Sequence, residues 1–206
     1  MADLDWTLFH WLNGQAGQHA WLDQLAKTAA TQLALVIVGT LAAGWLLAAS
    51  GHMGRERRLP RGLLTVVFVT GMSLALAFGV NQVVGHFWFR PRPYTGHRSA
   101  HLLLGPSSDP SFASDHATAG FALALGSISE LPRTATLLFF ETVLMSVGRI
   151  YVGLHYPGDI LGGLAIAAVT ALAIWWVVRR GAAVVNRIVD VVNDFAGRRG
   201  WPARLS

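Results

Sequence analysis

Residues 158–178 read GDILGGLAIAAVTALAIWWVV, and this run decides the class of fold. Asp159 is the only charged residue in it. About 20 apolar residues wound as an α-helix cross the ~30 Å hydrocarbon core of a bilayer. The sequence therefore predicts a membrane-spanning helix here.

Four earlier segments have the same character, so we expect an all-α polytopic membrane helix bundle of five spans. The segment 115–130 is shorter and richer in Gly and Ala, which predicts a helix surrounded by protein. Charged residues make up 13% of the 206-residue chain, against about 25% in soluble proteins. A single domain, 1–206, is expected, with a catalytic bundle at 29–180. The other three segments are 29–50, 62–84 and 133–153.

The two ends of the chain differ from the spans. Residues 4–25 are amphipathic and rich in Trp, which predicts an interfacial helix within residues 1–28, broken near Asn13-Gly14. An ordinary packed helix is the alternative. The tail 181–206 carries apolar and charged residues at helical spacing over 182–197, which predicts an amphipathic cytoplasmic helix.

Arginine placement predicts the orientation of the spans. The net charge of +5 comes mostly from Arg residues that punctuate apolar segments, a pattern of membrane loops rather than of nucleic-acid binding. The regions 51–61, 131–133 and 179–206 fall on one side of a five-span bundle, and the positive-inside rule makes that side cytoplasmic. No cleaved signal peptide is evident. We expect a multi-pass protein of the plasma or inner membrane.

Arginines on the opposite, extracytoplasmic side break this rule and need another reason. They are Arg90, Arg92, Arg98 and Arg149, and all but Arg98 belong to polar clusters at the outer ends of the spans, of which there are three. A guanidinium presents a planar fork of donors that matches phosphate oxygens, so arginines without nearby acids predict an anionic ligand. The clusters are Arg90-Pro91-Arg92-Pro93, Ser114-Asp115-His116, and Arg149 with His155 and Asp159.

The histidines supply the reactive groups. His155 and Asp159 are four residues apart, so the carboxylate can accept a hydrogen bond from one imidazole nitrogen and free the other to attack. His116 can protonate the departing oxygen. Helix N-termini at Ser114 and Pro157 would point outward and favour a phosphate. The set predicts a nucleophile, an acid and a phosphate-binding shell.

Other readings of the same residues stay open. His116, His155 and Asp159 could ligate a metal, but the adjacent arginines would repel a cation, so neither a metal nor another cofactor is expected. An anion transporter or channel would use the arginines as a selectivity ring. A serine protease would use Ser114, but it would leave the arginines unexplained. With no Cys in the chain, a cysteine-nucleophile phosphatase is excluded.

The three clusters resemble the signature of the type 2 phosphatidic acid phosphatase (PAP2) superfamily, over about residues 80–165. In outline that signature reads Lys-x6-Arg-Pro, then Pro-Ser-Gly-His, then Ser-Arg-x5-His-x3-Asp. The resemblance implies that His155 becomes phosphorylated with Asp159 as its partner and that His116 is the leaving-group acid. It further implies that no metal takes part. The implied phosphate-binding residues are Arg92, Arg149 and Ser114.

The sequence departs from this signature in four places. Gly85 stands where the lysine is expected, so Arg90 or His86 is the expected substitute in binding phosphate. Ala113 replaces the Pro, Asp115 replaces the Gly and joins the expected phosphate site, and Gly148 replaces the Ser.

The Ser-Asp-His variant and the Arg-Pro-Arg-Pro loop are similar to the branch of bacitracin-resistance undecaprenyl-diphosphate phosphatases. This similarity implies undecaprenyl diphosphate as substrate. Phosphatidylglycerophosphate or phosphatidic acid is the alternative. The expected partners are a lipid phosphate and the bilayer, with no nucleic acid and no obligatory protein partner.

Overall fold

The computed structural model of the chain describes the backbone of residues 2–50 and 61–198 and the side chains of residues 3–50 and 66–181. These ranges form helices and contain no strand, which confirms the all-α prediction. Arg55, Arg57, Arg58 and the tail residues 199–206 lie outside the described ranges. The helices are α1 (Ala2–Asn13), α2 (Ala20–Ala49), α3 (Arg61–Phe87), α4 (Pro93–Gly96), α5 (Asp115–Ser127), α6 (Pro132–Tyr151) and α7 (Pro157–Arg198).

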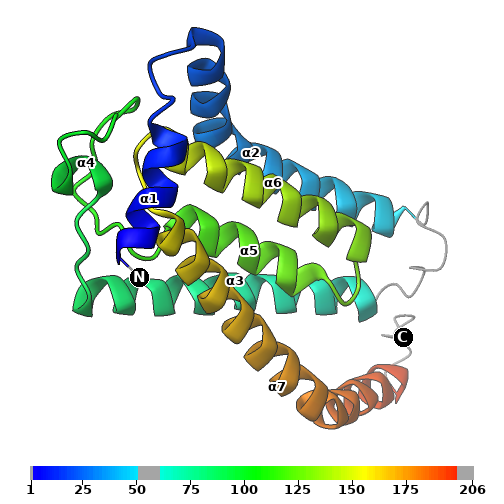
Figure 1. Cartoon of the computed structure of the whole chain (residues 1–206). Helices are drawn as coiled ribbons and strands as arrows, with labels where there is room; N and C mark the ends of the chain where they lie inside the picture. Colours follow the sequence, from blue (N-terminus) through cyan, green and yellow to red (C-terminus); the bar gives the residue numbers. More distant parts are fainter. Residues whose placement is uncertain (1, 51–60, 199–206) are drawn as a thin grey trace.

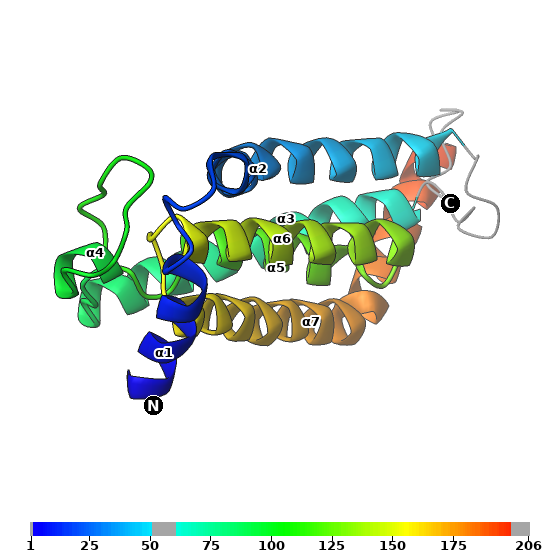
Figure 2. The same ribbon diagram turned by 45° about the horizontal axis from the view of Figure 1, so that its top comes forward.

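Helix α5 is the centre of the bundle. It packs on α3, α6 and α7, while α2 lies along α6 (Figures 1 and 2). A Cβ added at Gly163 of α7 would come within 2.9 Å of the Thr118 nitrogen, so only glycine allows α5 and α7 to lie this close. The prediction that this segment is surrounded by protein is confirmed. Its 13 residues reach only ~20 Å, short of the bilayer core.

Three helices of the described part are long and apolar enough to cross a membrane: Ala20–Ala49, Val66–Phe87 and Pro157–Gly181. The count of five spans is therefore not confirmed. In α7, the guanidinium of Arg179 lies 4.2 Å from the centre of the Trp175 ring. The guanidinium of Arg180 lies 5.0 Å from the centre of the Trp176 ring. Paired Trp and Arg side chains are typical of a membrane–water interface.

Both ends of the chain differ from the expected boundaries. The first helix ends at Asn13, as the Asn13-Gly14 pair predicted, but residues 20–28 belong to α2 rather than to an interfacial helix. Phe9 of α1 is fully buried against Ile150 and Tyr156, so α1 packs on the bundle. The expected separate tail helix is instead continuous with the last span in α7, which changes direction in Figure 1.

The loops that precede α5 and α7 gather at one end of the bundle, together with α1 and α4 (Figures 1 and 2). Asn13 ties them together. Its buried amide nitrogen donates to the carbonyl oxygens of His101 and Tyr151, each at 2.8 Å, and its Oδ1 accepts from the His101 nitrogen at 2.8 Å. These bonds fix the end of the bundle that carries the polar clusters.

Candidate active site

His155 lies in the loop between α6 and α7 and is 2% exposed. Gly153 shapes this loop, because its φ of +88° suits glycine and a Cβ there would collide with the carbonyl oxygen of His101. The Nδ1 atom of His155 lies 3.0 Å from the carbonyl oxygen of Ser111. Since a carbonyl only accepts, Nδ1 carries the proton and Nε2 carries the free lone pair.

Two buried arginines face Nε2. The NH1 atom of Arg92 and the NH2 atom of Arg149 each lie 3.4 Å from it. Backbone carbonyls hold both side chains: Arg92 donates to Asp109 and Leu154 at 3.1 and 3.0 Å, and Arg149 donates to Ala30 at 3.2 Å. The arginines are thus fixed around the free nitrogen of the imidazole.

A pocket of about 200 Å³ opens at this point, lined by Arg92, Arg149, His155 and His116 among others. Among the described residues, two buried donors have no hydrogen-bond partner: the Nε of Arg149, which lines this pocket, and the hydroxyl of Ser114, which lies between the pocket-lining residues Ala113 and Asp115. Ser114 occupies the N-cap position of α5, as expected, but its side chain makes no capping bond. Unpaired buried donors beside a pocket indicate a missing acceptor.

Asp159 is fully buried and stands behind His155. Its Oδ2 lies 3.7 Å from Nδ1, beyond ordinary hydrogen-bond length, so the expected direct bond is replaced by an indirect connection. Ser111 provides it: its hydroxyl donates to Oδ2 of Asp159 at 2.6 Å while its carbonyl accepts from His155. Ser111 was not predicted from the sequence, because no motif marks a serine inside this loop.

The structure does not bring Arg90 to the pocket. Its NH1 donates to Oδ1 of Asp159 at 2.7 Å, and its NH2 donates to Oδ2 of Asp5 at 2.6 Å. Its guanidinium also lies 4.0 Å from the centre of the Tyr156 ring. Both terminal nitrogens are therefore engaged by carboxylates, and Arg90 orients Asp159 instead of facing a phosphate.

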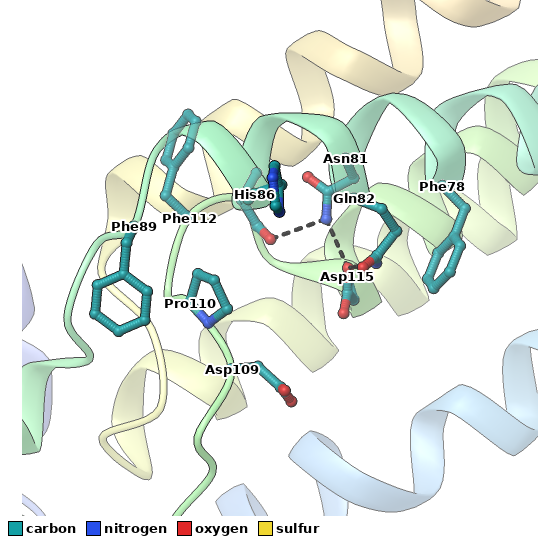
Figure 3. Close-up of a pocket in the computed structure, with 11 residues that line it drawn as sticks. Phe78, Asn81, Gln82, His86, Phe89, Asp109, Pro110, Phe112 and Asp115 are labelled. Atoms are coloured by element: carbon teal, nitrogen blue, oxygen red, sulfur yellow. Dashed lines mark hydrogen bonds between the residues drawn. The ribbon is translucent and has the colours of Figure 1, made fainter.

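His86 and Asp115 border a separate, larger cavity of about 710 Å³ next to the first (Figure 3). The Oδ1 of Asp115 accepts from the side-chain amides of Asn81 at 2.6 Å and Gln82 at 3.2 Å. The carboxylate, which also borders the small pocket, thus ties α5 to α3. His86 lines the larger cavity and not the pocket that holds the arginines.

Electrostatics favour a neutral imidazole at His155. Burial lowers the pKa of His155 below its ordinary 6.5, and the charges of Arg149 and Arg92 lower it further against the opposing effect of Asp159. The ring is therefore neutral near pH 7, with its lone pair on Nε2. No group of three or more His, Asp or Glu side chains within the described ranges is arranged to hold a metal ion.

An uncharged imidazole nitrogen between two fixed guanidinium groups, at one end of a helical membrane bundle, has the groups that nucleophilic attack on a phosphoryl group requires. Residues 65–182 match the model of the PAP2 superfamily, and the chain belongs to this family. The chain is thus an enzyme of the lipid phosphatase class, as the three clusters predicted.

Curated relatives agree with this assignment. The chain is 28% identical to the putative undecaprenyl-diphosphatase YbjG of Escherichia coli, over 85% of this chain and 84% of that protein. It is 27% identical to undecaprenyl-diphosphatase BcrC of Bacillus subtilis, over 62% and 72%. It is 33% identical to the decaprenylphosphoryl-5-phosphoribose phosphatase of Mycobacterium tuberculosis, over 68% and 74%.

One solved structure supports the fold. The crystal structure of LpxE from Aquifex aeolicus superposes with a TM-score of 0.61 at 23% identity and covers 84% of this chain and 94% of that one.

Proposed function

We propose that this chain hydrolyses undecaprenyl diphosphate at the extracytoplasmic face of the membrane, through a phosphohistidine on His155. The observation that carries the proposal is the Nε2 lone pair of His155, held between Arg92 and Arg149 at the wall of the small pocket. A terminal phosphate placed there would meet the attacking nitrogen and supply an acceptor for the unpaired donors of Arg149 and Ser114.

The proposed reaction has two steps. In the first, Nε2 of His155 forms a bond to the terminal phosphorus, the bond to the bridging oxygen breaks, and His116 gives that oxygen a proton. Undecaprenyl phosphate leaves. In the second, His116 takes a proton from a water molecule whose oxygen attacks the phosphohistidine, and inorganic phosphate is released with His155 restored. The arginines stabilise the charge on the equatorial oxygens in both steps.

A groove of about 420 Å³ supports a lipid substrate. It starts at Asp115 and His116 and is lined by apolar side chains of α2, α3, α5 and α6, including Val38, Leu74 and Leu123. His116 borders both this groove and the small pocket, so a leaving group protonated by His116 would lie at the mouth of the groove. This position suits the isoprenyl chain of the departing lipid.

Two belts of aromatic side chains support the proposed placement in the membrane. Trp11 in α1, Trp21 at the start of α2 and Trp88 after α3 are exposed at 76%, 69% and 68%, whereas Trp175 and Trp176 lie near the other end of the candidate span Pro157–Gly181. Arg133 begins α6 at the end opposite Arg149, which fits a cytoplasmic far end under the positive-inside rule. We propose that α5 and α6 complete a five-helix bundle, with α5 shielded from lipid by its neighbours.

Phosphate release from undecaprenyl diphosphate by the purified protein tests the proposal. We expect turnover that resists EDTA, is inhibited by vanadate, and is lost in His155→Ala. A 32P-labelled substrate should leave acid-labile, base-stable label on the wild type and none on His155→Ala. Turnover that EDTA abolishes and vanadate spares would refute the metal-free mechanism.

The same assay separates the alternative substrates. The Mycobacterium relative is named for a phosphorylated lipid-linked sugar, so a decaprenylphosphoryl phosphoribose belongs in the panel beside phosphatidylglycerophosphate and phosphatidic acid. A higher kcat/KM for any of these would displace undecaprenyl diphosphate. An anion transporter would keep its transport in His155→Ala, because a selectivity ring needs the arginines and not the imidazole.

A further inference from the structure

The side chain of Asp5 in α1 makes contacts at the site that α1 does not need for its own packing. Its Oδ2 accepts from Arg90 at 2.6 Å, and its Oδ1 accepts from the backbone nitrogen of Gly158 at 2.7 Å. Gly158 lies in the first turn of α7, one residue before Asp159. A single carboxylate thus holds both the guanidinium and the helix start that orient Asp159.

From Asp5 a continuous series of short contacts leads to His155. Arg90 donates to Oδ1 of Asp159 at 2.7 Å, and Ser111 donates to Oδ2 at 2.6 Å. The carbonyl of Ser111 accepts from Nδ1 of His155 at 3.0 Å. Each link is a hydrogen bond to a charged or buried group, so a shift of one member displaces the next.

Other residues already anchor α1 to the bundle. Phe9 is fully buried in an apolar cluster, and Asn13 makes three hydrogen bonds to the neighbouring loops. The Asp5 side chain is 15% exposed and comes from the opposite, N-terminal end of α1. Removing its charge should therefore leave α1 in place and act on Arg90.

We propose that Asp5 is a positioning residue for the nucleophile, acting through Arg90, Asp159 and Ser111 to fix the direction of Nε2 of His155. The inference rests on the proposed function of His155. It assigns α1 a role in the reaction, in addition to its packing on the bundle. Without the carboxylate, Arg90 keeps one acidic partner, and Asp159 turns with it.

The test compares Asp5→Asn with Asp3→Asn in the full-length protein. The two aspartates lie in the first turn of the same helix, but Asp3 is exposed and Asp5 holds Arg90. We expect Asp5→Asn to lower kcat by about 10-fold to 100-fold, by analogy with side chains that orient metal ligands, with KM within about twofold of the wild type. Asp3→Asn should match the wild type, and Asp5→Glu should recover part of the loss.

Vanadate binding supplies a readout that does not depend on the lipid. Titrated by calorimetry, Asp5→Asn should bind vanadate about tenfold more weakly with unchanged stoichiometry. Two results would refute the positioning role. If Asp5→Asn keeps the wild-type kcat and vanadate affinity, the carboxylate is not needed to position His155. If only the stoichiometry of vanadate binding falls, fewer molecules are folded and Asp5 serves only folding. If the wild type hydrolyses no lipid phosphate but vanadate binding still shifts, the proposed function fails and the positioning role stands.

Discussion

Two buried serines that lie three residues apart should respond to the same substitution in opposite ways. Ser111 and Ser114 are both 0% exposed, and each loses only a hydroxyl when changed to Ala. The Ser111 hydroxyl donates to the Asp159 carboxylate at 2.6 Å, whereas the Ser114 hydroxyl has no partner among the residues that the structure describes. The first hydroxyl is therefore needed by the resting fold, and under the proposed function the second would donate to a phosphate in the adjacent pocket.

The magnitudes follow from these contacts. A hydrogen bond to a charged group contributes ~1.5–3 kcal/mol, so Ser111→Ala should destabilise the protein by that amount and lower Tm by about 3–12 °C. Ser114→Ala removes an unpaired buried hydroxyl and should change the free energy of unfolding by less than ~0.5 kcal/mol. Its effect should appear on binding: losing one donor to a charged phosphate analogue weakens vanadate inhibition about tenfold or more.

Thermal unfolding in detergent and vanadate inhibition constants measure the two effects on the same samples. Thr118→Ser, on the next turn of α5, controls for a small change in this region. The reasoning is refuted if Ser114→Ala lowers Tm as much as Ser111→Ala, or if it leaves the inhibition constant at the wild-type value. Either result would mean that the Ser114 hydroxyl has a structural partner and is not held for a ligand.

Three further predictions concern pH, the groove and the packing of α6. Because the pKa of His155 is lowered in the folded protein, the unfolded state binds a proton more readily below about pH 6.5. Tm should therefore fall with pH in the wild type more than in His155→Gln. Val38→Trp should raise KM for a long isoprenyl substrate about tenfold, since covering two CH2 groups contributes ~1.6 kcal/mol. KM for a short water-soluble phosphate ester should be unaffected, and so should the control Leu35→Trp, at an exposed residue of α2 that does not line the groove. Gly148→Ser should destabilise the protein by ~1–3 kcal/mol, measured by thermal unfolding. A Cβ at this position would lie 3.0 Å from the backbone oxygen of Ala26 and 3.0 Å from the backbone nitrogen of Ala30. A variant as stable as the wild type would contradict the close packing of α2 on α6.

The sequence predicted the helices well because long apolar runs have few alternatives in a membrane. It also predicted that three clusters far apart in sequence would meet, since all three lie at the same ends of predicted spans. Arg92, Arg149, His116 and His155 do line one pocket. The predicted start of the first span, residue 29, was wrong. The helix begins at Ala20, but polar residues within 20–28 interrupt the apolar pattern from which the start was predicted.

The directions of side chains in the loops were not predictable in the same way. Arg92 has φ −70° and ψ 156°, close to the polyproline conformation, in which side chains two residues apart point in different directions. Arg90 and Arg92 therefore separate, although the sequence presents them as a pair. Ser111 and Asp5 carry no periodic signal, because their roles arise only when α1 and the loop before α5 are packed together.

This separation divides the charges of the site into two groups with different roles. Arg90 lies between Asp5 and Asp159, so two carboxylates neutralise it and it is complete within the protein. Arg92 and Arg149 donate to backbone carbonyls, and within the described ranges neither is recorded in an ion pair with a carboxylate. Burying two positive charges is costly, and the neutral His155 between them adds no compensation. Asp109 and Asp115 also line the pocket, but no ion pair of either with these arginines is seen among the described residues. A bound phosphoryl group would remove that cost at the same position where Nε2 can attack it, so binding and positioning for attack are one event at this site.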